Sequence, residues 1–575
     1  MPINLEPILK TAEPIYGKAH AEIMCRKLAE MIAKYQFPPQ LIAYSERDAI
    51  LITYGDMVTH PNEDPLFTLR RFLNHHAKKA INTVHILPFF PYSSDEGFSV
   101  IDYKTVNPRL GSWDDIHALS VDFSLMMDLV ANHSSVEHQW FKGFLAGRKA
   151  YENYYISISP DSDTRSVFRP RTSPLLTPFE TKAGEKYVWT TFSADQADLN
   201  YQEPQVLLEM LDTLLLYASQ SARYIRLDAI AYIWKELGTS SIHLPQVHAI
   251  IQMMRMLLNA VSPGVKLITE TNVPHKDNIS YFGNGMNEAQ LVYNFSLPPL
   301  TLHAFHTGDS EIFSRWAATL EAPSESTTFF NFLASHDGIG ITPAHGLLPQ
   351  NEITRMAERV EASGGYVSYK TNADGSQSAY EFNINYFDAL DDPQESGIPV
   401  KLKVRRFITA HAIMAALQGV PGIYFHSLFG STSWFDGARK SGTPRTINRQ
   451  RLLLERVEAE LANENSLRHQ IYTGLKDLLL ARRLHPAFHP NASQSVPWVN
   501  PSVITILRHA RGTGRKAICL HNIRAEKTQV NLGEISGLAE ISDPVRVIYH
   551  NNPANSVLDG QTITLSAYES VWLEV

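Results

Sequence analysis

The stretch YIRLDAIAY (Tyr224–Tyr232) contains the pattern on which the fold assignment rests. Its first four residues form a short, mostly apolar run typical of a buried strand. The run ends at Asp228, and a helical pattern over Gln205–Ala218, which begins after Pro204, precedes it. A helix that leads into a short buried strand is one repeat of a parallel α/β fold.

Seven further apolar runs of this kind lie along the chain, and several are separated by helical patterns. Eight such units predict an α/β protein: a (β/α)₈ TIM barrel with inserted loop domains and a C-terminal all-β domain. The eight runs are Ala49–Tyr54, Thr83–Pro88, Ser124–Val130, Tyr224–Leu227, Lys266–Thr269, Leu291–Phe295, Thr328–Leu333 and Gly422–Phe425.

The spacing of the runs divides the chain into five regions. The gaps after the third and seventh runs are too long for simple connections, and such insertions lie at the barrel face where active sites form. After about residue 487, short strands and turn signals replace the earlier pattern. We therefore predict an N-terminal helical extension (1–48), a catalytic barrel (49–130, 203–337 and 405–486), an inserted domain B (131–202), a loop-rich lid B′ (338–404) and a C-terminal β domain (487–575).

The composition is that of an ordinary globular protein, with 44% hydrophobic and 19% charged residues among 575. A net charge of −8 without a basic stretch argues against nucleic acid as a partner. The two cysteines, Cys25 and Cys519, argue against a disulfide framework. Polar residues and a proline interrupt the most membrane-like run, Phe407–His426, which argues against a membrane span. Glu6 falls where the apolar core of a signal peptide would lie, so we expect no export signal. We expect a cytoplasmic monomer or homodimer without a membrane partner.

Acidic residues follow three predicted strands: Asp228 the fourth, Glu270 the fifth and Asp337 the seventh. Neighbouring strands lie ~4.8 Å apart, close to the ~5–5.5 Å between the two carboxyls of a retaining glycosidase. One carboxylate attacks the anomeric carbon there, and the other carboxyl protonates the leaving oxygen. Alone, each acid is more often a helix cap or ion-pair partner. Their combination favours an enzyme that transfers glycosyl groups with retention.

One arginine and two histidines, Arg226, His133 and His336, lie near these predicted strand ends in the sequence. Arg226 is two residues before Asp228, so both point to the same side of the strand, and we expect the guanidinium to keep Asp228 ionised. Glu270 requires a raised pKa to hold its proton. We expect Asp128 to be structural, and His133 and His336, each taken alone, to be core or loop histidines.

Four short motifs occupy these strand ends: DLVANH (128–133), RLDA (226–229), Glu270 and HD (336–337). Together they resemble the signature of glycoside hydrolase family 13, the α-amylase family. The resemblance implies a barrel with a small domain after its third strand and a β-sandwich at its C-terminal end. It also implies a nucleophile, an acid/base and a transition-state stabiliser at Asp228, Glu270 and Asp337, and a glucosyl unit held by His133, Arg226 and His336.

Further segments resemble the sucrose phosphorylase subfamily: HILPFFPYSSDEGFSVIDY (85–103), RLGSWDD (109–115), RPR (169–171), DAIAY (228–232), SLPPL (296–300), SHDGIG (335–340) and INR (447–449). In that subfamily phosphate attacks the glucosyl-enzyme and α-glucose 1-phosphate leaves. The resemblance therefore implies a small-molecule glucoside and inorganic phosphate as partners. The residues it implies are Asp95 and Arg449 on the glucose hydroxyls, Phe98 and Gln196 in the pocket wall, and Arg171 and Tyr232 on phosphate.

The acceptor side departs from sucrose phosphorylases, because Asn272 stands where they have His. The segments 270–278 and 368–383 instead resemble phosphorylases of glucosylglycerol and glucosylglycerate. A glycerate carboxylate calls for Arg or Lys, and residues 338–350 contain neither. His345 and Gln377 stand where the glycerate relatives have Arg, although Lys370 or Arg171 could serve the carboxylate. We therefore predict 2-O-α-glucosylglycerol as the substrate.

Several alternatives stay open. The nearest is a glucosylglycerate phosphorylase, followed by a phosphorylase of sucrose or sucrose 6-phosphate. A plain α-glucosidase uses the same covalent intermediate, and a non-catalytic binding protein of the same fold is a different class altogether. The resemblance implies no cofactor and no metal, and the insertion near Asn132 shows no acidic cluster for calcium.

Overall fold

The computed structural model describes residues 3–372, 374–395, 397–536, 545–552 and 557–575. It describes the side chains of all these residues except 557–559. The predicted regions 1–48, 338–404 and 487–575 therefore each include a few residues outside the described ranges. Within those ranges, no helix is long and apolar enough to cross a membrane.

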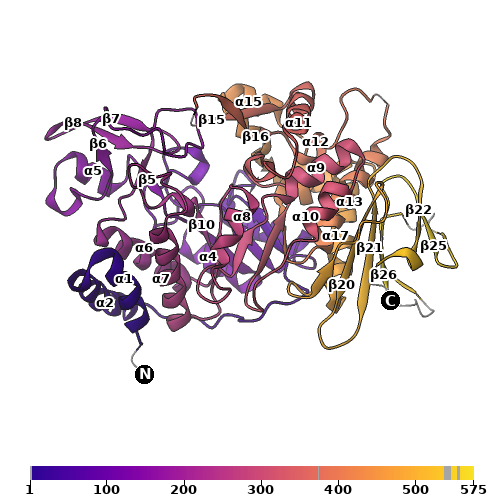
Figure 1. Cartoon of the computed structure of the whole chain (residues 1–575), viewed down its shortest axis with the longest axis horizontal. Helices are drawn as coiled ribbons and strands as arrows, with labels where there is room; N and C mark the ends of the chain where they lie inside the picture. Colours follow the sequence, from indigo (N-terminus) through magenta and orange to yellow (C-terminus); the bar gives the residue numbers. More distant parts are fainter. Residues whose placement is uncertain (1–2, 373, 396, 537–544, 553–556) are drawn as a thin grey trace.

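Eight parallel strands close into a barrel at the centre of the molecule (Figure 1), which confirms the predicted fold class. Each strand lies within two residues of its predicted bounds and is buried almost throughout, as expected for strands covered on both faces. In order around the barrel they are β1(Ile50–Thr53), β3(Thr83–Ile86), β4(Ser124–Val130), β10(Ala222–Asp228), β11(Lys266–Thr269), β12(Leu291–Tyr293), β13(Thr328–Phe332) and β17(Val420–Tyr424).

Helices between successive strands cover the outside of the barrel. The predicted helix Gln205–Ala218 is α6(Pro204–Ser219), and its leucines other than Leu216 are buried. Pro204 begins the helix because proline lacks only an amide that the first turn leaves unpaired. The other covering helices are α3(Pro65–His76), α4(Trp113–Asp122), α7(Pro245–Val261), α9(Leu297–Thr307), α13(Val400–Ala416) and α17(Leu467–Arg482).

The two long insertions follow β4 and β13. The first contains β5(His133–Ser135), α5(Gln139–Leu145), β6(Ser157–Ile158), β7(Leu176–Thr181), β8(Gly184–Trp189) and β9(Gln196–Asp198). The second is more regular than the predicted loop-rich lid. It holds β14(Ile339–Gly340), α11(Gln350–Ala362), β15(Tyr366–Thr371) and β16(Gln377–Asn383), and these strands form one antiparallel sheet. Helix α11 buries Ile353, Met356 and Val360, a helical spacing that the sequence already contained.

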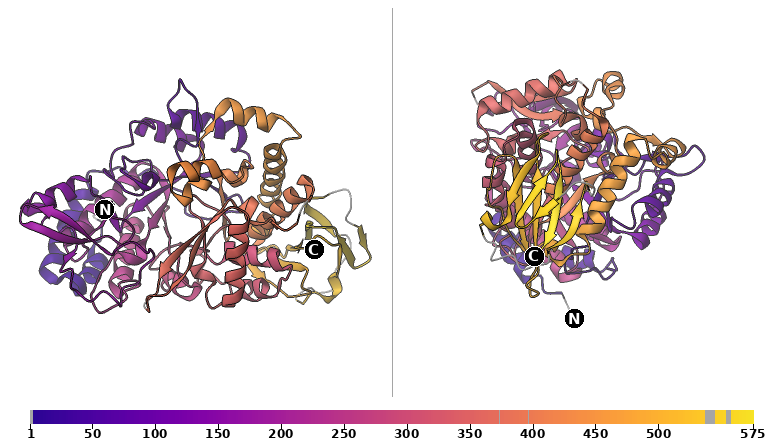
Figure 2. Two further views of the ribbon diagram at one scale, coloured as in Figure 1. Left: turned by 90° about the horizontal axis from the view of Figure 1, so that it is seen from above. Right: turned by 90° about the vertical axis from the view of Figure 1, so that its right-hand side faces the viewer.

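The two ends of the chain lie at opposite ends of the molecule (Figure 2). The N-terminal helical extension contains two helices, α1(Glu6–Tyr16) and α2(Lys18–Ile32), which are separated by Gly17 with a φ of 78°. They pack against α7 and α6. The C-terminal region contains two sheets, ordered β19(Ser493–Ser495), β20(Val503–His509), β21(Lys516–Asn522), β26(Ser570–Glu574), β23(Arg546–His550) and β22(Thr528–Asn531), β25(Thr562–Leu565), β24(Val557–Asp559).

Two buried arginines join the barrel to the C-terminal sheets. Arg482 donates to carbonyls of Ala415 at the end of α13, Gly419 before β17, and Phe488. Arg508 on β20 donates to the carbonyl of Ala416, the next residue of α13, at 2.7 Å. Burial lowers the pKa of Arg482 to about 10 and that of Arg508 to about 9. Main-chain carbonyls of the barrel and of the C-terminal region stabilise these two buried charges.

Replacing Arg482 with Met should destabilise the fold strongly. Each buried acceptor left without a donor costs about 1–3 kcal/mol, so we expect a loss of more than about 3 kcal/mol in the free energy of unfolding. Equilibrium denaturation measures this, with Arg483→Met as the matched control because Arg483 is only half-buried. Equal stability of the two variants would contradict the prediction.

Candidate active site

The pocket opens at the C-terminal ends of the barrel strands and receives side chains from both insertions. The predicted residues that line it are Asp95, Phe98, His133, Arg171, Gln196, Asp228, Tyr232, Glu270, Asn272, His336 and Asp337. Lining residues that the sequence analysis did not name include Phe192, Phe295, Tyr380, Glu381 and Arg445.

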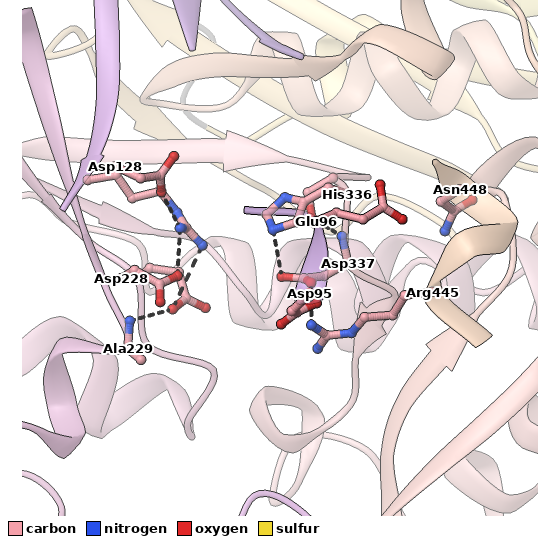
Figure 3. Close-up of polar contacts among 12 residues, drawn as sticks. Asp95, Glu96, Asp128, Asp228, Ala229, His336, Asp337, Arg445 and Asn448 are labelled. Carbon is pink, nitrogen blue, oxygen red and sulfur yellow. Dashed lines mark hydrogen bonds and ion pairs between the residues drawn. The ribbon is translucent and has the colours of Figure 1, made fainter. Parts of the chain in front are cut away.

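The floor of the pocket is organised by one buried guanidinium, that of Arg226 on β10. It donates to Asp228 Oδ1 at 2.7 Å, and its other terminal nitrogen lies 3.8 Å from Glu270 Oε2. The nitrogen that bonds Asp228, Nη1, also pairs with Asp128 Oδ1, and the other Asp128 oxygen lies 2.6 Å from His85 Nε2. Figure 3 shows Asp128 and Asp228 converging on this group. Asp128 therefore holds Arg226 in place, in line with its expected structural role.

Burial raises the pKa of both Asp228 and Glu270, and the neighbouring carboxyls raise it further while Arg226 opposes the shift. The expectation that Arg226 alone keeps Asp228 ionised is therefore incomplete, because desolvation outweighs it. Mutual repulsion favours a single proton shared by the pair. Since Arg226 bonds directly to Asp228, the arrangement with the proton on Glu270 is the favoured one.

A strained residue sets the position of Glu270. Ala229, directly after Asp228, has a φ of 48° in the left-handed region that non-glycine residues avoid. This conformation turns its amide toward Glu270 Oε2, to which it donates at 3.0 Å. Strain of this kind costs about 1–3 kcal/mol and persists where the surroundings enforce it.

Asp337 contacts a histidine and two arginines, and Figure 3 shows it beside His336 and Arg445. Arg445 Nη1 lies 2.6 Å from Asp337 Oδ1, and Arg449 Nη2 lies 3.4 Å from the same oxygen. Although burial raises the pKa of Asp337, Arg445, His336 and Arg449 together lower it well below its usual range. Asp337 is therefore ionised. Arg449 Nη1 also lies 3.3 Å from Asp95 Oδ1, which places Arg449 and Asp95 close enough together to bind the same ligand.

Two histidines complete the inner wall as neutral groups. Burial lowers the pKa of His336 to about 3, and its ring stacks on Phe98 with centroids 4.7 Å apart. Burial also lowers the pKa of His133, whose Nε2 lies 3.1 Å from Gln196 Nε2 and 3.0 Å from the Phe98 carbonyl. Neutral imidazoles beside an uncharged amide and a main-chain carbonyl can hydrogen-bond the hydroxyls of a sugar, and they suit a sugar better than a cationic ligand.

The structure does not bring His345 and Gln377 into the pocket lining. Gln377 is exposed at the start of β16, where it pairs with Thr371, and His345 lies near Ala379 and Lys370. In contrast, Asn272 lines the pocket, and its buried Oδ1 has no partner among the described residues. That oxygen is available to a ligand hydroxyl.

Two of the pocket residues that were not predicted, Glu381 and Arg445, are joined by a bidentate ion pair. Arg445 Nε and Nη2 lie 2.9 and 2.6 Å from the two Glu381 oxygens. Arg445 is four residues before Arg449 of the quoted INR motif, and Glu381 lies in the quoted segment 368–383. At Glu381 the available signal was a single charged residue between the aromatic residues Tyr380 and Phe382.

A buried lysine joins the first insertion to the barrel. Lys235 Nζ lies 2.6 Å from Asn132 Oδ1 and 2.7 Å from Asp198 Oδ2, and all three side chains are buried. Burial lowers the pKa of Lys235 and Asp198 opposes this. In the described part of the chain, no group of three or more His, Cys, Asp or Glu side chains is arranged to hold a metal ion.

Comparison with known proteins identifies the family that this barrel and carboxyl set define. Residues 74–342 match the catalytic domain of alpha-amylase. The chain belongs to the α-amylase family, and within it to the sucrose phosphorylase-like enzymes, which are glycoside phosphorylases of the glycosyltransferase type.

Particular relatives refine this. The chain is 47% identical to a glucosylglycerate phosphorylase of Allomeiothermus silvanus, over 90% of this chain and 92% of the relative. It is 43% identical to one of Escherichia coli, over 98% of both. A glucosylglycerol phosphorylase of Marinobacter adhaerens is 28% identical over 76% of this chain and 88% of the relative. Sucrose 6F-phosphate phosphorylase from Thermoanaerobacter thermosaccharolyticum shares the fold, with a TM-score of 0.72 at 24% identity over 83% of this chain and 94% of that one.

Replacing Lys235 with Met should loosen the first insertion. It leaves the buried Asp198 carboxylate without its cation, which costs about 3–5 kcal/mol. We expect a lower unfolding temperature and faster proteolysis within residues 131–202. The double variant Lys235→Met/Asp198→Asn should recover part of the loss, because it removes the unpaired charge; no recovery would contradict the ion-pair explanation.

Proposed function

We propose that this protein catalyses the reversible phosphorolysis of glucosylglycerate to α-D-glucose 1-phosphate and glycerate. The observation that carries the substrate assignment is that relatives named glucosylglycerate phosphorylase are 43–47% identical over 90–98% of this chain. The relative that acts on glucosylglycerol is 28% identical. These matches support the alternative to the glucosylglycerol assignment drawn from the sequence.

The glucosylglycerol prediction was based on the absence of Arg and Lys from residues 338–350 and from position 377. Of these residues, Gly338 and Gly340 line the pocket, whereas His345 and Gln377 do not. Arg171 from the first insertion and Arg445 after the last strand do line it. The absence of arginine from one loop therefore does not argue against a carboxylate in the acceptor.

In the first half-reaction, Asp228 attacks the anomeric carbon and the bond from that carbon to the glycerate oxygen breaks. Glu270 gives its proton to that oxygen, so glycerate leaves with its hydroxyl restored and a β-glucosyl ester forms on Asp228. The positive charge that develops on the sugar is opposed by Asp337, which its arginines keep ionised.

In the second half-reaction, a phosphate oxygen attacks the same carbon from the side that glycerate left. The ester bond to Asp228 breaks, and Glu270, now ionised, accepts the proton of the attacking phosphate. Two inversions give net retention, so the product is the α-anomer. Arg171 and Tyr232, on the outer wall of the pocket, are the groups we assign to phosphate.

The remaining predicted residues surround the glucosyl unit. Asp95 and Arg449, which are already ion-paired, fit the sugar hydroxyls, and Phe98 supplies an apolar face. His133, Gln196 and His336 provide neutral polar contacts around the same unit. Asn272 faces the acceptor side, where its unpartnered oxygen can accept from a glycerate hydroxyl.

The substrate assignment is tested by supplying α-glucose 1-phosphate with D-glycerate, glycerol, fructose, fructose 6-phosphate or no acceptor, and measuring phosphate release. We expect release with D-glycerate to exceed release with glycerol by at least tenfold. Preference for glycerol would restore the assignment from the sequence. Equal release without acceptor would identify a hydrolase.

Variants of the two central carboxyls should separate their roles. Because burial raises the pKa of Glu270, phosphorolysis should lose rate as rising pH removes that proton. Glu270→Gln should retain the release of fluoride from α-glucosyl fluoride, whose leaving group needs no proton, while losing activity on the glycoside by at least about 10²-fold. Asp228→Asn should lose both reactions. If Glu270→Gln abolished fluoride release as well, the acid assignment would be wrong.

A further inference from the structure

The turn that carries Asp95 has an unusual backbone conformation. Asp95, Glu96 and Gly97 have φ values of 50°, 47° and 119°, so three successive residues have positive φ. Glycine adopts such values freely, whereas other residues avoid them and are strained there. Strain of this kind persists only where the surroundings enforce it. The contacts around residues 94–97, which we call the Asp95 turn, must therefore supply that support.

The first support comes from the first insertion and holds the chain before Asp95. Ser94 Oγ donates to Asp195 Oδ2, and Ser93 Oγ donates to the same oxygen at 2.6 Å. Neither bond involves Glu96, so the second strained residue needs a support of its own.

Glu96 is held from another direction by Arg451. Arg451 Nη1 lies 2.9 Å from Glu96 Oε2, and Arg451 Nε donates to Asp56 Oδ1 at 2.8 Å. The guanidinium also lies 4.3 Å from the ring centroid of Tyr54. Although burial lowers the pKa of Arg451, Asp56 and Glu96 raise it above its usual range. Glu96 therefore faces a cation that two carboxylates and an aromatic ring hold in place.

The position of Arg451 itself is set by main-chain pairing. Arg451 directly precedes β18(Leu452–Leu453), which pairs in parallel with β2(Val58–Thr59). Its Nη1 also donates to the carbonyl of Arg449 at 2.8 Å. The guanidinium thus has a fixed place from which to hold Glu96.

We propose that Arg451 is a positioning residue that holds the Asp95 turn in its strained conformation through Glu96, and thereby keeps the Asp95 carboxylate beside Arg449. The side chain of Asp95 is 32% exposed, so burial alone does not hold it there. Neither Arg451 nor Glu96 is among the described residues that line the pocket, so both act on a ligand through Asp95 and Arg449. The inference rests on the proposed function in one respect, the assignment of Asp95 and Arg449 to the sugar hydroxyls.

The strain provides a specific test, because glycine adopts the backbone conformation of Glu96 without cost. Glu96→Ala removes the ion pair and keeps the strain. We expect it to lower kcat/KM for glucose 1-phosphate and for α-glucosyl fluoride by a similar factor, roughly 10–100-fold. Glu96→Gly removes the same ion pair together with the strain, and it should recover at least about fivefold of this loss.

The phosphate side of the reaction serves as an internal control. In both Glu96 variants, the KM for phosphate in transfer from α-glucosyl fluoride should change by less than about threefold, because phosphate binds on the other side of the anomeric carbon. A general disturbance of the pocket would affect both sides alike.

Variants of Arg451 test the other partner of the ion pair. Arg451→Met should lower the same two kcat/KM values by roughly 10–100-fold, but by less than about threefold when it is added to Glu96→Gly, where residue 96 is no longer strained. Arg456→Met is the matched control and should keep wild-type rates, because Arg456 is an exposed arginine that pairs with Glu460 within α16(Leu454–Ala462).

Equal activity of Glu96→Ala and Glu96→Gly would overturn the inference, because strain would then play no part. So would wild-type rates in Arg451→Met, an undiminished loss when Arg451→Met is added to Glu96→Gly, or a phosphate KM that rises as much as the donor kcat/KM falls. Asp95→Asn separates these results from the proposed function. If Asp95→Asn kept wild-type rates on both donors, the assignment of Asp95 to the glucosyl unit would be wrong, and the inference with it.

Discussion

The site depends on the burial of one positive charge at the bottom of a pocket full of carboxyls. Strand register places Arg226 beside Asp128 on the neighbouring strand. Main-chain hydrogen bonds between the two strands, rather than a loop, therefore fix the positions of the guanidinium and of the Asp128 carboxylate that pairs with it. Without that cation, several acidic groups would share a desolvated space at high electrostatic cost. With it, Asp228 and Glu270 can occupy adjacent strand ends while differing in protonation.

A second layer of charge pairs connects the insertions to this floor. Glu381 on β16 holds Arg445, and Arg445 holds Asp337, so the second insertion is coupled to the end of β13 through two ion pairs. Lys235 joins Asp198 of the first insertion to Asn132 after β4. The insertions are therefore attached to the pocket by its own polar groups. These polar contacts hold the insertions, and with them the outer pocket wall that includes Arg171. They do not require an apolar interface across the mouth of the pocket.

Much of this architecture was predictable because it is encoded locally. Apolar runs and their charged ends located all eight strands, and the order of strand ends brought Asp228, Glu270 and Asp337 together. Glu381 and Arg445 could not be found in the same way, because their pairing joins residues 64 positions apart. The comparisons favour a different acceptor from the one that the sequence predicted, for a related reason. The arginines of the pocket lining, Arg171 and Arg445, lie in two separate segments outside residues 338–350, so a count within that loop does not measure the positive charge of the pocket.

The arginines beneath the barrel have a consequence for how the molecule is divided. Arg482 and Arg508 are solvated by carbonyls from α13, from the approach to β17 and from the turn before the C-terminal sheets. Neither region can separate without leaving a bare buried guanidinium or a set of unpaired carbonyls. The C-terminal sheets are therefore not a detachable module. Barrel and sheets should melt as one cooperative unit, and a boundary drawn near residue 487 marks a change of architecture rather than a point at which the chain can be cut.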